Sequence, residues 1–106
     1  MILRVWQGWT SPEMASHYAA LLRSDIFPAI VGRAIPGFRG IELGRRSVDD
    51  AVEFVTVMRF DSLEAVRTFA GPDFEVAVVP PRAREILLRF EERSAHYELV
   101  EARPAA

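Results

Sequence analysis

Residues 52–60, VEFVTVMRF, show a clear alternation of side chains along the chain. One parity consists of Val52, Phe54, Thr56, Met58 and Phe60, and the other of Glu53, Val55, Val57 and Arg59. A period of two among β-branched and aromatic residues predicts a β-strand. Because both parities contain apolar residues, we expect this strand to lie inside the sheet and to be covered on both faces.

A helix is predicted directly after this strand, over DSLEAVRTFA. Asp61 is expected to cap it, and Glu64, three residues later, completes a pattern like a capping box. Val66 and Phe69 form its buried stripe, and Gly71 is expected to end it.

The flanking segments predict the other elements. A first strand at 2–9 is followed by a helix with Ser11 as N-cap and Pro12 in its first turn, and Pro28 should kink or break this helix near residues 24–25. A strand at 38–46 and a loop at 47–50 form a hairpin with the central strand. We expect a helix at 82–90, with Phe90 on its apolar face, and a last strand at 95–101. Residues 74–79 fit either a helical turn or an extended run.

The order of these elements is typical of a ferredoxin-like α+β fold, βαββαβ, with a four-stranded antiparallel sheet and a single domain over residues 1–106. The helices should cover one sheet face, carrying either the set Leu3, Val5, Ile41, Leu43, Tyr97 and Leu99 or the opposite parity. The other face would also be apolar. An exposed apolar sheet face marks an interface, so we expect a homodimer that packs sheet against sheet.

Composition narrows the function classes. The formal net charge is −2, the arginines are scattered and there is no lysine, so no basic patch for nucleic acid is evident. Cysteine is absent, which excludes disulfides and thiolate metal sites and fits the cytoplasm. The first residues, MILRVWQGW, lack the long apolar run of a signal peptide or membrane span. We expect neither nucleic acid nor a membrane as partner.

Several short motifs resemble one known family. They are Glu53-Phe54-Val55, Asp61-Ser62-Leu63-Glu64-Ala65, Phe69-Ala70-Gly71, Asp73, Ala77, Pro80 and His96-Tyr97-Glu98. Together they resemble small proteins of the antibiotic biosynthesis monooxygenase (ABM) superfamily, the dimeric α+β barrel proteins, over residues 8–100. The resemblance implies a ferredoxin-like monomer, a dimer with facing sheets and an apolar pocket between sheet and helices. Characterised members oxidise polycyclic phenols without metal or flavin, or degrade haem.

Two absences separate this chain from those mechanisms. Haem-degrading relatives hold haem with an Asn, a Trp and a His on the helix after the third strand. Residues 62–70 contain no His, and the chain contains no Asn. Cofactor-free oxygenase relatives also use an Asn in their pocket. The resemblance therefore supplies no ready set of catalytic residues, and we expect weak haem binding without degradation.

Three side chains are candidates for chemistry. His96, on the last strand, could be a general base near neutral pH, or it could pin a neighbouring segment by a hydrogen bond. Arg4 and Trp6 share one face of the first strand. They could stabilise an anion and wall an aromatic ligand. Alternatively, Arg4 pairs across strands with Glu98 or Glu42, and Trp6 fills the dimer core.

Tyr18 on the first helix and Phe54 on the central strand complete the expected substrate-binding set, although both also fit a simple core. We expect no cofactor and no metal site, because no metal-ligand spacing is present. Two functions stay open. One is a domain that binds a small aromatic or apolar molecule, acting if catalytic as a cofactor-independent monooxygenase on a phenol. The other is a non-catalytic dimeric module for ligand binding or structure.

Overall fold

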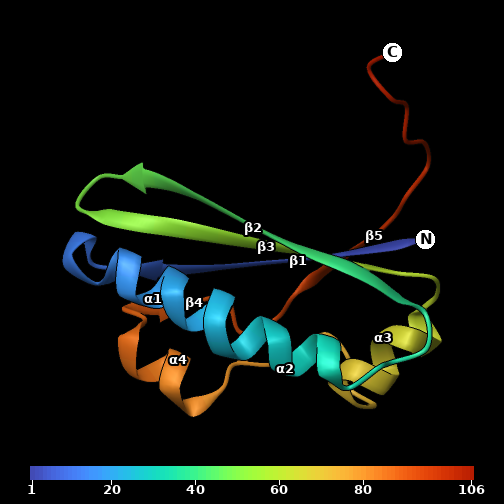
Figure 1. Ribbon diagram of the computed structural model, residues 1–106, viewed down its shortest axis with the longest axis horizontal. Coiled ribbons are helices and arrows are strands. Elements are labelled where there is room, and N and C mark those ends of the chain that lie inside the picture. Colours follow the sequence, from blue (N-terminus) through green and yellow to red (C-terminus); the bar gives the residue numbers. More distant parts are fainter.

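The computed structural model describes all 106 residues and confirms the predicted α+β fold class (Figure 1). The strands are β1 (Ile2–Thr10), β2 (Phe38–Val48), β3 (Ala51–Phe60), β4 (Arg89–Phe90) and β5 (Ala95–Glu98). The helices are α1 (Ala15–Leu21), α2 (Phe27–Gly32), α3 (Leu63–Ala70) and α4 (Pro81–Ile86). A 3₁₀ turn at Pro12–Met14 precedes α1, and a π-helical turn at Leu22–Ile26 joins α1 to α2.

The sheet is antiparallel and has five strands rather than the four predicted. Strand β3 lies between β2 and β1, as its two apolar faces predicted. On the other edge of β1, β5 pairs with residues 2–5 and β4 with residues 8–9. Two short strands therefore share one edge. Between them the backbone leaves β1, and the N–H of Ser94 donates to the Glu75 carbonyl at 2.6 Å.

The helix predicted at 82–90 is wrong in its second half. Helix α4 begins at Pro81 and ends at Ile86, and Leu87 is already extended. The N–H of Leu88 then donates to the carbonyl of Trp9 at 2.8 Å, and Phe90 pairs with Gly8. The free edge of β1 needs hydrogen-bond partners, and this tertiary demand overrides the local helical pattern.

The long first helical segment is continuous through Pro28. Instead of breaking, the backbone widens into the π-helical turn, where the N–H of Phe27 donates to the carbonyl of Leu22. Pro28 follows this turn as a residue of the first turn of α2, and its nitrogen carries no hydrogen to donate. The predicted break is thus replaced by a π-turn, and Leu22 and Ile26 are both buried.

Two local predictions are corrected at the ends of β3. The N-cap of α3 is Ser62, whose hydroxyl accepts from the N–H of Ala65 at 3.2 Å, and not Asp61. Glu64 therefore lies one position too early for a capping box. Asp61 instead accepts two hydrogen bonds from Arg39, which lower the pKa of its carboxyl group.

The β2–β3 hairpin is also tighter than predicted. Strand β2 continues to Val48, and only Asp49 and Asp50 form the turn. Asp49 has a φ of 53°, a left-handed conformation that Asp tolerates better than most residues. The last strand, β5, ends at Glu98 and does not reach residue 101.

All the helices lie on one face of the sheet (Figure 1). Phe54, Met58 and Phe60 of β3 face these helices and are buried. The β1–β3 register places Arg4 opposite Met58 and Trp6 opposite Thr56, so both side chains belong to this covered face. Neither predicted set is correct as a whole. Ile41 and Leu43 of β2 lie on the covered face as in the first set, but β1 contributes Arg4 and Trp6 to this face and not Leu3 and Val5.

The other face of the sheet carries no helix (Figure 1). Its central side chains are Leu3 and Val5 from β1 and Val55 and Val57 from β3, with Tyr97 of β5 beside them at 56% exposure. No helix of the chain is both long and apolar enough to span a membrane.

Candidate functional site

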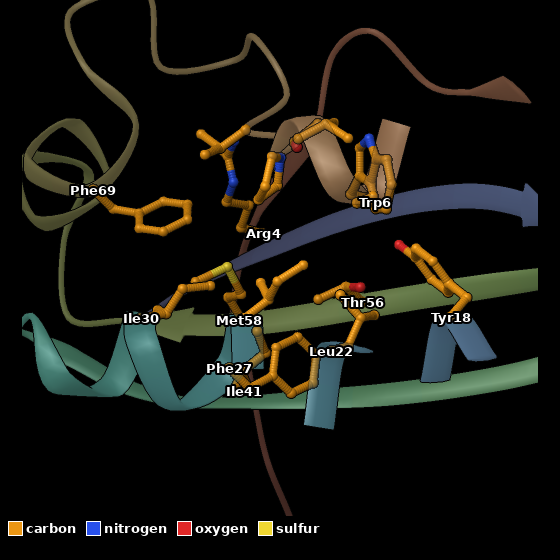
Figure 2. Close-up of a pocket in the computed structure, with 16 residues that line it drawn as sticks. Arg4, Trp6, Tyr18, Leu22, Phe27, Ile30, Ile41, Thr56, Met58 and Phe69 are labelled. Carbon is orange, nitrogen blue, oxygen red and sulfur yellow. The ribbon is translucent and has the colours of Figure 1, made fainter. Parts of the chain in front are cut away.

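A pocket lies between the covered face of the sheet, the first helical segment and residues 78–80, which lead into α4 (Figure 2). Twelve of its sixteen lining residues are hydrophobic. The full lining is Arg4, Trp6, Tyr18, Leu22, Ile26, Phe27, Ile30, Ile41, Thr56, Met58, Phe69, Val78, Val79, Pro80, Ala83 and Ser94. An apolar cavity with a few polar groups is typical of a small-molecule site.

The pocket is narrow. Its free volume is about 60 Å³. Pockets for drug-sized ligands span roughly 300–1,000 Å³. A bicyclic aromatic molecule would therefore have to displace side chains at the mouth before it could enter completely.

Arg4 is the charged group of the pocket, and it is only 3% exposed. Its guanidinium donates to the carbonyls of Phe74 at 2.5 Å and Val76 at 3.2 Å, and it contacts His96 at 2.9 Å. No carboxylate pairs with it, so the predicted ion pair with Glu98 or Glu42 does not form. Glu42 pairs with Arg59 instead. Burial lowers the pKa of Arg4 to about 10, which still leaves it charged at neutral pH.

His96 lies beside Arg4 on β5 but does not line the pocket. Arginine nitrogens only donate, so Nε2 of His96 accepts from Nη1 of Arg4 and the proton of the neutral ring is on Nδ1. Nδ1 is buried and has no partner. Burial and then the Arg4 charge lower the pKa of His96, which favours its neutral form. The ring also packs edge-on against Phe74, 5.0 Å between centroids.

Trp6 presents its ring to the pocket, and its indole N–H donates to the carbonyl of Glu91 at 2.6 Å (Figure 2). It also packs against Phe90, 6.0 Å between ring centroids. The interpretation that Trp6 fills a dimer core is therefore wrong, since the residue lies on the helix-covered face. The indole is instead positioned as an aromatic wall of the pocket.

Tyr18 reaches the pocket from α1, and Figure 2 shows its hydroxyl directed towards Trp6. The residue is 1% exposed, and burial raises the pKa of its hydroxyl to about 12, so the hydroxyl can donate a hydrogen bond at neutral pH. Phe54 does not line this pocket. It packs edge-on behind Tyr18, 4.8 Å between ring centroids, and holds that ring in place.

Sequence reasoning missed several of the lining residues. Thr56 and Met58 follow from the parity of β3 once Arg4 is known to face the helices. Phe69 was predicted as buried in α3, but nothing local indicated that it borders a pocket. Val78 and Val79 come from the segment 74–79, for which no structure could be chosen. No three His, Asp or Glu side chains are grouped closely enough to hold a metal ion.

Solved structures share this fold. A candidate antibiotic biosynthesis monooxygenase from Bacillus cereus superimposes with a TM-score of 0.69 at 13% identity, over 99% of this chain and 96% of that one. The monooxygenase from the gene ActVA-Orf6 of Streptomyces coelicolor, in complex with nanaomycin D, gives 0.62 at 17% identity, over 99% and 92%. Rv0793 from Mycobacterium tuberculosis gives 0.54 at 24% identity, over 99% and 98%.

These likenesses confirm the fold that the resemblance to the ABM superfamily implied. At such low identity they show a shared architecture and not a shared reaction. No protein-family model matches the sequence, and no curated protein is significantly similar to it.

Proposed function

We propose that the chain binds an aromatic molecule with an acidic hydroxyl group, in its phenolate form, and oxidises it as a cofactor-independent monooxygenase. The observation that carries this proposal is Arg4, a buried guanidinium without a carboxylate partner on the wall of an apolar pocket. A buried cation of this kind favours an anionic ligand, and an opposite charge nearby lowers the pKa of a phenol. A structural neighbour with bound nanaomycin D supports small-molecule binding in this fold.

The reaction needs no reductant besides the substrate. Loss of the phenolic proton raises electron density on the ring, and a ring carbon can then transfer electrons to dioxygen. A hydroperoxide forms at that carbon and loses water to leave a quinone. One oxygen atom enters the product and the other leaves as water, so the substrate is oxidised while dioxygen is reduced.

Within this scheme Arg4 would stabilise the phenolate and Trp6 would stack on the ring. Tyr18 would donate a hydrogen bond to an oxygen of the ligand. His96 remains our candidate base. To act as the base, Nε2 of His96 must release the hydrogen bond that it accepts from Arg4 and accept one from the substrate hydroxyl instead, because Arg4 now occupies its lone pair.

The hydrogen bond from Arg4 to His96 also favours the second candidate function, a module that binds the ligand without turnover. In that case His96 is an anchor for Arg4, and the site recognises an anion but holds no free base. Oxygen consumption distinguishes the two functions.

We also propose a homodimer in which the uncovered sheet faces meet. The apolar centre of this face, at Leu3, Val5, Val55 and Val57, supports it. The ion pairs of Arg59 with Glu42 and of Arg46 with Glu53 border the face as a polar rim would.

The test is a titration of the protein with 2-naphthol while its ionisation is followed by absorbance, with 2-methoxynaphthalene as the ligand that cannot ionise. We expect the naphtholate band to appear at lower pH in the complex than in free solution. Arg4→Gln should weaken naphtholate binding by roughly 10- to 100-fold, since hydrogen bonds to charged groups contribute about 1.5–3 kcal/mol. Binding of the methyl ether should change much less.

Oxygen uptake with quinone formation would establish the monooxygenase. A shifted ionisation without oxygen uptake would establish the binding module instead. If neither naphthalene binds, or if Arg4→Gln leaves the ionisation shift intact, the proposed site is wrong.

A further inference from the structure

A second hollow adjoins the mouth of the pocket, between α2, the last turn of α3 and residues 78–82. The two share five lining residues, Ile26, Ile30, Phe69, Val78 and Pro80. These five apolar side chains form a wall that borders both the inner pocket and the outer hollow. Displacing part of it would make the two spaces continuous.

Phe69 is the part of the wall that connects two arginines. Its ring centre lies 5.5 Å from the guanidinium carbon of Arg4 and 5.4 Å from that of Arg33. Arg4 belongs to the inner pocket and Arg33 to the outer hollow. Arg33 also donates to the backbone carbonyls of Thr68 at 3.2 Å and Phe69 at 3.3 Å, which fixes it at the end of α3.

The charges in the two spaces are unbalanced. Arg4, Arg33 and Arg82 face a single carboxylate, Asp25, which pairs with Arg82. Arg33 has no carboxylate partner. The whole chain carries a formal net charge of −2, so this local excess of cations does not follow from a basic composition. Two arginines without carboxylate partners, one on each side of this apolar wall, match a ligand with an anionic group at each end.

We propose that the inner pocket and the outer hollow form one elongated site for a hydroxylated aromatic carboxylate. Its phenolate oxygen lies at Arg4, its rings replace the partition at Phe69 and Val78, and its carboxylate binds Arg33 in the outer hollow. This inference rests on the proposed function and adds a second recognition point that selects among phenols.

The experiment compares 6-hydroxy-2-naphthoic acid with its methyl ester, which have nearly the same shape but differ in charge. Affinities are measured for the wild type and for Arg33→Gln, Arg33→Lys and Arg45→Gln. Arg45 is an exposed arginine of β2 that lines neither of these two spaces, so its variant controls for the loss of one positive charge.

The wild type should bind the acid about three- to tenfold more tightly than the ester, as expected for a partly exposed charge-assisted contact. This ratio should fall to about one in Arg33→Gln, be largely kept in Arg33→Lys and be unchanged in Arg45→Gln. It should also shrink as salt is added.

A wild type that binds both probes equally, or an Arg33→Gln variant that keeps the preference, overturns the carboxylate subsite while leaving the phenolate pocket intact. If neither probe nor 2-naphthol binds, the proposed function itself fails. The two failures are therefore distinguishable.

Discussion

At the scale of single residues, the pair Arg4 and His96 shows how a charge is kept inside this small protein. A buried guanidinium is costly unless its donors are satisfied, and here two backbone carbonyls and a neutral imidazole accept from it. Protonation of His96 would turn its Nε2 into a donor and place a second positive charge against Arg4. The arrangement therefore requires His96 to stay neutral.

This requirement predicts the pH dependence of stability. Burial and then Arg4 lower the pKa of His96 from its usual 6.5, and Glu75 opposes the shift. The unfolded chain therefore takes up this proton at higher pH than the folded one does. The contribution of His96 is fully present above about pH 6.5 and is lost as the pH falls through the lower pKa of the folded state.

We expect His96→Gln to flatten the decrease in melting temperature between about pH 8 and about pH 5. The exposed His17 on α1 supplies the matched control, and His17→Gln should keep the slope of the wild type. Thermal melts at several pH values test this. A slope in His96→Gln equal to that of the wild type would contradict the arrangement described above.

At the scale of elements, the π-helical turn before Pro28 has a consequence for the pocket. Leu22 and Ile26, at its two ends, both line the cavity. A π-turn adds about one residue to a helical turn and often occurs at functional sites. The helix thereby accommodates a proline and still presents a continuous apolar surface above Ile41 and Met58.

The start of α3 allows a direct test of which residue caps it. Ser62→Ala removes the acceptor for the N–H of Ala65 and should lower the free energy of unfolding by about 1 kcal/mol. Asp61→Ala breaks only an exposed ion pair with Arg39 and should cost less. Urea denaturation of both variants measures the difference. A larger loss of unfolding free energy in Asp61→Ala than in Ser62→Ala would show that Asp61 is the cap, as the sequence predicted.

At the scale of the whole molecule, the sheet separates two apolar environments. The covered face contains the core and the pocket, and the uncovered face is available for the proposed partner copy. Val57 lies near the centre of the uncovered face, opposite Val5 on β1 and Glu42 on β2. Trp6 lies on the covered face.

Val57→Glu should therefore yield monomers at micromolar concentration, because it buries like charges at the centre of the interface. Trp6→Ala should keep the dimer and weaken binding of 2-naphthol, because it removes a wall of the pocket. Sedimentation velocity reports the assembly state of each variant. A dimer that survives Val57→Glu would place the contact elsewhere, and a monomeric wild type would remove the dimer altogether.

Local patterns in the sequence determined the order of elements and the fold class. The alternation in residues 52–60 made β3 an internal strand, and the signals at Pro12 and Gly71 marked helix ends correctly. These features depend on residues close together in the chain, where backbone propensity and side-chain period act directly. His96 and Arg4 were also recognised as candidates.

The tertiary structure alone decided which face of the sheet received the helices. Both parities of β3 are apolar, so period-two reasoning could not choose between them. The sequence offered Glu98 or Glu42 as the partner of Arg4, yet carbonyls from residues 74 and 76 accept its hydrogen bonds in the core. The edge of β1 likewise drew residues 89–90 out of a helical pattern into a strand. Each outcome depends on hydrogen-bond partners distant in sequence, and such partners become adjacent only when the chain has folded.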